Sequence, residues 1–194
     1  MIKKVKSSQS VFIRIAGIFS LTGGILYLLT VLVHPHGYAR AAVPVSIVFM
    51  LMGVLGLHLL LWKHEGRIGL VGFLLVIIGL LLSIVGMAGS ALGVLNPNPV
   101  APIINTGEHL GLVFIGAGML CWGIVTLKVK ALGNWSFLPF IISLFGLAGV
   151  FFVNPDLFAT LERFGAPQLF ALCWGLLGYA LLKSQAKKAL TEER

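Results

Sequence analysis

The sequence contains six apolar stretches, each about as long as the hydrocarbon core of a membrane is thick. A helix needs about 20 apolar residues to cross a core of roughly 30 Å, because each residue adds about 1.5 Å. The stretches cover residues 11–33, 41–62, 68–95, 109–127, 135–153 and 166–182. Hydrocarbon offers peptide groups no hydrogen-bond partner, so a spanning segment must be a helix or a strand of a closed barrel. Since none of the stretches shows the apolar–polar alternation of a barrel strand, the sequence predicts an all-α membrane protein.

The balance of apolar and charged residues also excludes an ordinary soluble domain. Hydrophobic residues make up 58% of the 194-residue chain and charged residues 10%, whereas an ordinary soluble domain has about 25% charged residues. The connections between stretches hold from a few residues to about a dozen. Short connections make consecutive helices antiparallel neighbours. We therefore expect one polytopic membrane domain, a bundle of six transmembrane helices arranged as three antiparallel hairpins.

The basic residues predict how this bundle is oriented. Six crossings place the two tails and the second and fourth connections on one side, and 12 of the 14 basic residues belong to these segments. They are Lys3, Lys4, Lys6, Arg14, Lys63, Arg67, Lys128, Lys130, Lys183, Lys187, Lys188 and Arg194. Only Arg40 and Arg163 fall on the other side. The positive-inside rule then makes both termini cytoplasmic, in a cell (inner) membrane, with the first helix retained rather than cleaved.

The formal net charge of +8 raises the question of an anionic partner. Juxtamembrane lysines and arginines are attracted to anionic headgroups by about 1 kcal/mol each. We therefore expect membrane lipids at the cytoplasmic face as the partner, and no nucleic acid. Other copies of the chain or subunits of a membrane complex are the remaining candidate partners.

Small residues form a regular pattern in the third stretch. Helices in lipid associate where small side chains allow their backbones to approach, so this pattern predicts that the third helix is the central, closely packed one. The alternative is that bare backbone lines the path of a solute. The seam residues are Gly72, Gly79, Ser83, Gly86, Ser90 and Gly93. Shorter seams occur in the first helix (Ala16, Ser20, Gly24) and in the sixth (Ala171, Gly175, Gly178).

Ionisable residues inside a membrane are the usual indication of function, and the spans contain almost none. Only His58 lies within a span, about one turn from the cytoplasmic end of the second helix. It can hydrogen-bond a neighbouring helix or reach the interface. No Asp, Glu, Lys or Arg falls near a midplane, which argues against a proton-driven pump.

The outer ends of the helices hold a candidate metal site. His34, His36, Glu108 and His109 would be the ligand set, because zinc takes three or four imidazole, thiolate or carboxylate ligands. The alternative is that these are solvated residues where helices end, since Pro35 stops the first helix between the two histidines.

Helices four and six share the sequence Leu-Cys-Trp-Gly, at residues 120–123 and 172–175, which favours a duplication. Three stretches carry a family resemblance: RIAGIFSLTGGILYLL (14–29), GIVTLKVKALGNWSFLPFIISLFG (123–146) and FALCWGLLGYALL (170–182). They resemble small, uncharacterised, multi-pass bacterial membrane proteins of the DUF4386-like type. Three hairpins with a proline after each odd helix give a looser likeness to HdeD-type acid-resistance membrane proteins. The resemblance implies a bacterial cytoplasmic membrane, and neither group supplies catalytic residues to carry over.

No nucleotide-binding loop, nucleophile elbow or pair of carboxylates within a helix occurs in the sequence. The sequence therefore predicts no catalytic or cofactor-binding residues, and a non-enzymatic integral membrane protein. Such a protein would act through helix packing as a structural or assembly subunit, or in envelope stress. The alternatives are a passage for a small neutral solute and a metal-dependent enzyme at the outer end.

Overall fold

The structure, a computed structural model, describes residues 2–33, 42–64, 66–93, 101–148 and 165–192. Side chains are described over residues 9–33, 43–64, 66–86, 110–147 and 165–185. The described residues form six α-helices and one short 3₁₀ helix, with no strand among them. The helices are α1 (Ile2–Leu32), α2 (Ala42–Leu61), α3 (Gly66–Gly93), α4 (Ala101–Val129), η2 (Gly133–Trp135), α5 (Leu138–Ala148) and α7 (Ala166–Glu192). The predicted all-α bundle of six helices is confirmed.

Four of the helices are long and apolar enough to cross a membrane. These segments are Gln9–Leu32, Val43–Leu61, Gly66–Gly86 and Leu110–Val129. The described part of α5 has 11 residues, and its short apolar segment is Gly133–Leu147. The crossings predicted for 135–153 and 166–182 therefore stay predictions, and the chain is compatible with a multi-pass membrane protein.

Several helix ends differ from the predicted spans. α1 begins at Ile2 rather than residue 11, α4 at Ala101 rather than residue 109, and α7 continues to Glu192 rather than ending at 182. Apolarity marks only the part of a helix that lipid surrounds, whereas the backbone hydrogen bonds continue into polar flanks. α5 begins at Leu138 rather than residue 135, because η2 occupies the intervening turn.

Prolines begin four of the helices. Pro102, Pro139 and Pro167 are the second residues of α4, α5 and α7, and Pro44 is the third residue of α2. The first turn of a helix needs no N–H donor, and the fixed φ of proline suits it. These prolines therefore start helices without weakening them.

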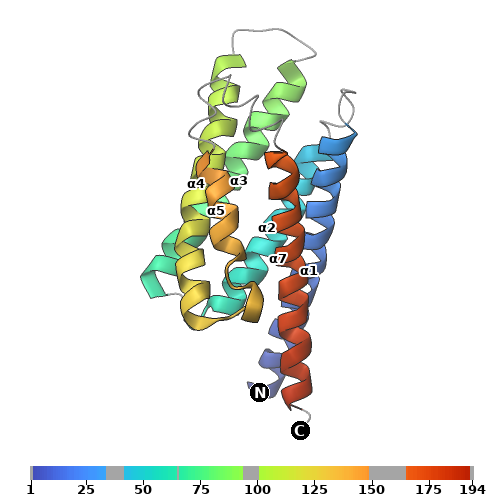
Figure 1. Ribbon diagram of the computed structural model, residues 1–194, viewed down its shortest axis with the longest axis vertical. Helices are drawn as coiled ribbons and strands as arrows, with labels where there is room; N and C mark the ends of the chain where they lie inside the picture. Colours follow the sequence, from blue (N-terminus) through green and yellow to red (C-terminus); the bar gives the residue numbers. More distant parts are fainter. Residues whose placement is uncertain (1, 34–41, 65, 94–100, 149–164, 193–194) are drawn as a thin grey trace.

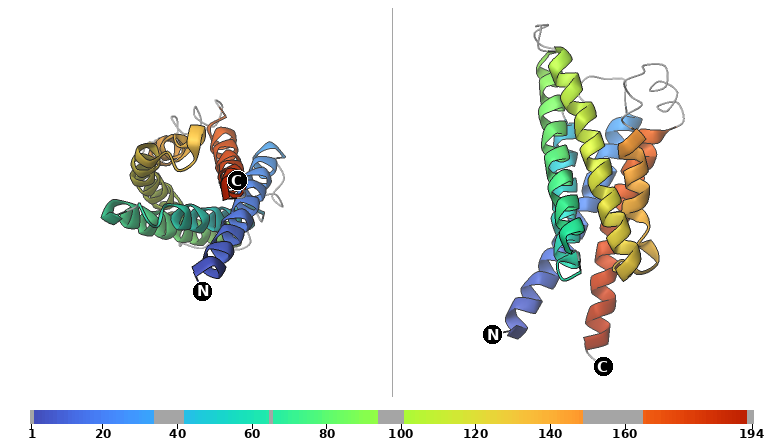
Figure 2. Two further views of the ribbon diagram at one scale, coloured as in Figure 1. Left: turned by 90° about the horizontal axis from the view of Figure 1, so that it is seen from below. Right: turned by 90° about the vertical axis from the view of Figure 1, so that its left-hand side faces the viewer.

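The helices form two groups of three that meet in one bundle (Figures 1 and 2). In one group α1 packs against both α2 and α7, and in the other α4 packs against both α3 and α5. The contacts of α2 with α3 and of α5 with α7 are smaller and join the groups. The expected third hairpin therefore forms only a minor contact, because α5 packs mainly on α4 and α7 mainly on α1.

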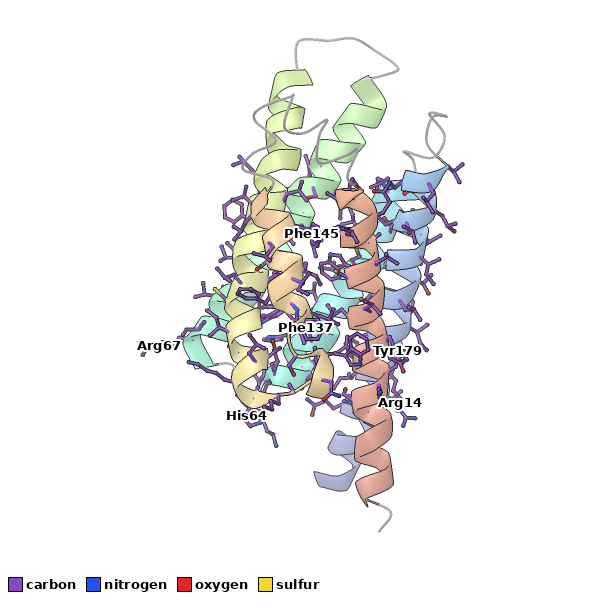
Figure 3. All side chains as sticks on the ribbon, in the orientation of Figure 1. Arg14, His64, Arg67, Phe137, Phe145 and Tyr179 are labelled. Atoms are coloured by element: carbon purple, nitrogen blue, oxygen red, sulfur yellow. The ribbon has the colours of Figure 1, made fainter. Side chains whose placement is uncertain are left out.

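Both chain ends and the described parts of the second and fourth connections lie at one end of the bundle, which is the lower end in Figure 1. Figure 3 places Arg14, His64 and Arg67 at the same end. Lys63, Lys128, Lys130 and Lys183 belong to the segments at this end and are exposed. The basic segments thus share one end of the bundle. The side of the membrane that this end faces stays a prediction.

The interior of the bundle is one apolar cluster to which all six helices contribute. Its largest fully buried side chains include Trp122, Trp174, Met50, Met119 and Leu57. The outer surface is also apolar, with exposed large hydrophobic side chains on every helix, among them Ile18, Val48, Leu74, Leu127, Leu144 and Leu172. An apolar surface of this extent on all sides is typical of a protein that lipid surrounds.

Candidate functional site

The predicted metal ligands lie where the structure gives no side chains. His34 and His36 are outside the described residues, and Glu108 and His109 belong to the third turn of α4, where only the backbone is described. The sequence expected His109 to begin its helix, so this placement corrects that boundary. Among the described side chains, no group of three or more His, Cys, Asp or Glu is arranged to hold a metal ion.

The predicted seam on α3 lies against α4. A Cβ added to Gly79 would be 2.6 Å from the carbonyl oxygen of Gly111 and 2.7 Å from the amide nitrogen of Ile115. A Cβ added to Gly72 would be 2.9 Å from the carbonyl oxygen of Gly118. Ordinary carbon contacts are near 3.5–4.0 Å, so neither position has room for a side chain. These glycines bring two backbones together rather than line an opening.

Two of the remaining seam residues, Ser83 and Gly86, lie among the described side chains. Ser83 is buried and faces Gly111, where an added Cβ would meet the Ser83 hydroxyl oxygen. That oxygen has no hydrogen-bond partner among the described residues. Gly86 is buried, whereas Ser90 and Gly93 lie in the last turns of α3, beyond the described side chains.

The partner glycines on α4 were not anticipated, although the sequence contains a signal for them. Gly111 and Gly118 stand seven residues apart, as do Gly72 and Gly79. In an antiparallel pair these spacings match, so that Gly72 lies against Gly118 and Gly79 against Gly111. Comparing the glycine spacing of neighbouring helices would therefore have predicted the pair.

The third helix packs closely against α4, as expected, but it is not central to its group, because α4 contacts both α3 and α5. α3 carries small residues on the face towards α4, packs Phe73 against His58 of α2, and exposes large side chains such as Leu70, Leu74 and Leu81 elsewhere. α4 instead has two small faces, because Gly116 lies against Gly146 of α5 while Gly111 lies against α3. Helices that can be approached closely on two sides occupy the centres of the groups.

α1 has the same two-sided design. On one side, a Cβ added to Gly24 would be 2.5 Å from the amide nitrogen of Gly175 in α7. On the other side, a Cβ added to Gly53 of α2 would be 2.5 Å from the hydroxyl oxygen of Ser20 in α1. The same hydroxyl donates a hydrogen bond of 3.2 Å to the carbonyl oxygen of Trp174. Ser20 thus links all three helices of its group.

His58, the intramembrane polar residue, packs within an aromatic cluster. Its ring is 8% exposed and stacks on Phe73 of α3, with centroids 4.1 Å apart and an interplanar angle of 17°. The Trp62 ring packs edge-on against the His58 ring, with centroids 5.0 Å apart. Phe73 also approaches Trp122 of α4, with centroids 6.1 Å apart. The histidine therefore helps to join α2 to α3, one of the two contacts that connect the helix groups.

The two repeated Leu-Cys-Trp-Gly segments place both tryptophans in the core but bond them differently. Trp122 and Trp174 are fully buried. The indole nitrogen of Trp122 donates a 3.0 Å hydrogen bond to the carbonyl oxygen of Gly69 in α3. The indole nitrogen of Trp174 has no partner among the described residues. Cys121 and Cys173 are both free thiols.

This difference predicts unequal effects of the same substitution. Trp122→Phe and Trp174→Phe remove similar ring volume from buried sites, but only the first breaks a hydrogen bond. We expect Trp122→Phe to cost about 1 kcal/mol more stability than Trp174→Phe, as measured by unfolding in mixed detergent micelles. Equal losses in the two variants would contradict the bonding described here.

A small polar cluster fixes the turn between α4 and α5. The Thr126 hydroxyl lies 2.8 Å from the carbonyl oxygens of both Ser136 and Trp122, and donates its one proton between them. The Ser136 hydroxyl donates to the carbonyl oxygen of Gly133 at 2.9 Å and accepts the amide N–H of Leu132 at 3.2 Å. These bonds satisfy buried backbone groups where the chain reverses.

Thr126→Val keeps the shape of the side chain and removes its hydroxyl. We expect a loss of about 1 kcal/mol in unfolding free energy, because the buried carbonyl of Ser136 loses its donor. Thr30→Val is the control, because the Thr30 hydroxyl donates only within its own helix, to the carbonyl oxygen of Tyr27. A loss for Thr30→Val as large as that for Thr126→Val would show that the link to Ser136 contributes nothing.

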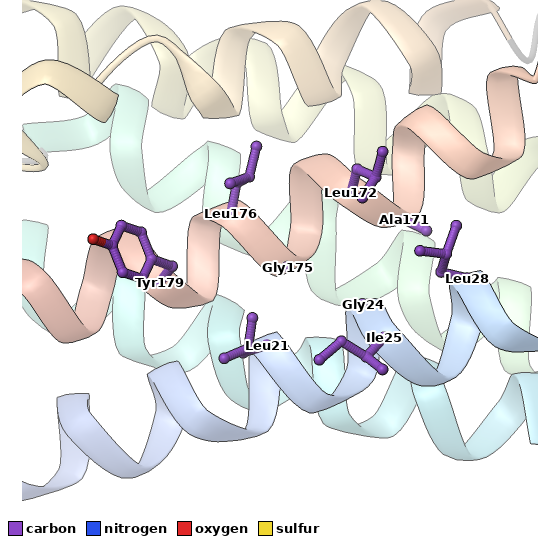
Figure 4. Close-up of a pocket in the computed structure, with 9 residues that line it drawn as sticks. All are labelled: Leu21, Gly24, Ile25, Leu28, Ala171, Leu172, Gly175, Leu176 and Tyr179. Atoms are coloured by element: carbon purple, nitrogen blue, oxygen red, sulfur yellow. The ribbon is translucent and has the colours of Figure 1, made fainter.

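A shallow apolar groove of about 400 Å³ runs along the outside of the α1–α7 contact (Figure 4). Gly24, Ala171 and Gly175 form its floor, where the two backbones come together, and Tyr179 lies at one end. The walls are Leu21, Ile25 and Leu28 of α1 and Leu172 and Leu176 of α7. The groove exists because small residues on the floor stand next to large ones on the walls.

No protein-family model matches the chain, and no curated protein and no solved structure matches it. The resemblance to small bacterial membrane proteins therefore stays a prediction.

Proposed function

We propose that the chain is an integral protein of a bacterial cytoplasmic membrane and acts through its helix contacts, as a structural or assembly subunit without catalytic activity. The observation that carries this proposal is the apolar outer surface on every helix around an interior that apolar side chains fill. In water such a surface would aggregate, whereas in lipid it needs no further cover.

The orientation follows from the basic end of the bundle. Lysines and arginines are retained on the cytoplasmic side during insertion, so we place both termini in the cytoplasm. The same residues would hold the protein against anionic headgroups of the inner leaflet.

The glycine contacts support packing over a solute passage. Gly72 and Gly79 lie directly against the backbone of α4, which leaves no path along this face of α3. We expect proteoliposomes containing the protein to release a small neutral solute such as glycerol no faster than empty liposomes. A rate several times faster would favour the passage instead.

Membrane fractionation tests the placement itself. We expect the full-length protein to stay in the membrane pellet after an alkaline carbonate wash and to be released only by detergent. Recovery of folded, monodisperse protein from the carbonate supernatant would contradict the proposal.

A further inference from the structure

The groove between α1 and α7 leads to two positive charges. Arg14 precedes Leu21 by seven residues on α1, and Lys183 follows Leu176 by seven residues on α7. Seven residues are two helical turns, so each charge continues the row of side chains that forms one wall. Both side chains are exposed.

Arg14 and Lys183 lie at the same height along the α1–α7 pair. α1 and α7 run antiparallel. A Cβ added to Gly17 would be 2.9 Å from the Cγ atom of Leu182 and 3.0 Å from the carbonyl oxygen of Gly178. Residues near 14 on α1 therefore lie beside residues near 183 on α7. Figure 3 shows Arg14 below Tyr179, towards the basic end of the bundle.

Aromatic side chains mark this level as the edge of the hydrocarbon. Tyr179 meets Trp135 of η2 edge-on, with centroids 6.1 Å apart, and the ammonium of Lys183 lies 6.0 Å from the Tyr179 ring. Tryptophan and tyrosine collect at the headgroup level of a bilayer. From Arg14 to Leu28 is 14 residues, or about 21 Å, which is close to one leaflet of about 15 Å together with its headgroups.

We propose that this groove binds one anionic phospholipid of the leaflet on the basic side, with an acyl chain along the groove and the phosphate between Arg14 and Lys183. The proposal rests on the membrane placement proposed above. An apolar cavity of a few hundred Å³ with a few polar groups at one end is the usual form of a small-molecule site. No described side chain is acidic, so none competes with a phosphate for these cations.

A second copy of the chain fits the groove less well. Two copies related by a two-fold axis along the membrane normal would bring their groove ends to the same level. Arg14 and Lys183 of each copy would then face the same charges of the other, and like charges in contact are unfavourable.

Native mass spectrometry of the detergent-solubilised, full-length protein tests the proposal. The probes are phosphatidylglycerol and phosphatidylcholine with identical acyl chains. A basic residue near an anionic surface favours anionic lipid roughly fivefold, so two should give about a 25-fold preference for the first bound phosphatidylglycerol. The Arg14→Gln/Lys183→Gln double variant should lose most of this preference.

Two control variants localise the effect. Arg67→Gln/Lys128→Gln removes two exposed charges from the same end of the bundle but from α3 and α4, and should keep the preference. Ile25→Trp fills the groove and should weaken lipid binding, whereas Leu74→Trp adds the same bulk to the exposed face of α3 and should not.

Four results would overturn the proposal. Three are no preference for phosphatidylglycerol in the wild type, equal losses of that preference in the two double variants, and equal losses of lipid binding in Ile25→Trp and Leu74→Trp. The fourth is a wild-type dimer that Ile25→Trp abolishes while lipid binding stays unchanged. In each case the protein would still fractionate with membranes, so the failure would not be that of the proposed placement.

Discussion

Gly79→Leu is expected to prevent the close contact of α3 with α4 and to lower the free energy of unfolding by about 3 kcal/mol or more. The first added carbon would already fall 2.6 Å from the carbonyl oxygen of Gly111 and 2.7 Å from the amide nitrogen of Ile115. Both atoms belong to helix backbone, which cannot rotate away as a side chain can. Overpacking usually costs about 1–3 kcal/mol, and a backbone obstacle places this case at the upper end or beyond.

The measurement is the thermal midpoint of the purified variant in detergent, together with its yield in the membrane. Ile78→Trp is the matched control, because Ile78 is the adjacent residue on α3 and its side chain is 44% exposed. Added bulk on that face should change stability by no more than about 0.5 kcal/mol. If Gly79→Leu were as stable as Ile78→Trp, the α3–α4 contact would not be the one described.

Trp122→Ala is the second substitution for which we expect a large effect, a loss of about 3 kcal/mol. Trp122 is fully buried, donates to the carbonyl oxygen of Gly69 and approaches Phe73, so truncation opens a cavity between α3 and α4. Such truncations cost about 3–5 kcal/mol in soluble proteins. We expect the lower end here because the unfolded helices remain in lipid, so less transfer free energy is lost.

Trp62→Ala separates this packing loss from any general effect of removing an indole. Trp62 follows the end of α2 and is 63% exposed, so its truncation should cost well under 1 kcal/mol. The free energy of unfolding of both variants is measured by titration with dodecyl sulfate, monitored by circular dichroism. A loss for Trp62→Ala similar to that for Trp122→Ala would contradict the assignment of Trp122 to the core.

The helices were predictable because their cause is local. A run of apolar residues in the third stretch predicts a helix in lipid whatever its neighbours are, and α3 begins and ends within two residues of the predicted span. The ends of α1, α4 and α7 were not predictable from apolarity, because backbone hydrogen bonds continue past the last lipid-facing residue. The unexpected length of α4 also placed Glu108 in the helix and moved His109 from its first residue to its third turn.

The choice of partners was harder to predict because it depends on two surfaces at once. Short connections predicted that α5 and α7 would pair, but Gly146 instead lies against Gly116 of α4, and Gly175 against Gly24 of α1. A row of small residues on one helix predicts that another helix packs closely there, but it does not identify that helix. The aromatic stack of His58 on Phe73 likewise had no local signal.

The central claim is that the helices cross a membrane and hold the basic segments on its cytoplasmic side. Labelling of single cysteines with a membrane-impermeant maleimide, in intact and in permeabilised cells that carry the protein with Cys121 and Cys173 replaced, tests it most directly. We predict that cysteines at positions 6, 64, 130 and 188 react only after permeabilisation, and that cysteines at positions 38, 98 and 158 react in intact cells. Reaction of positions 6 and 188 under opposite conditions would contradict the account.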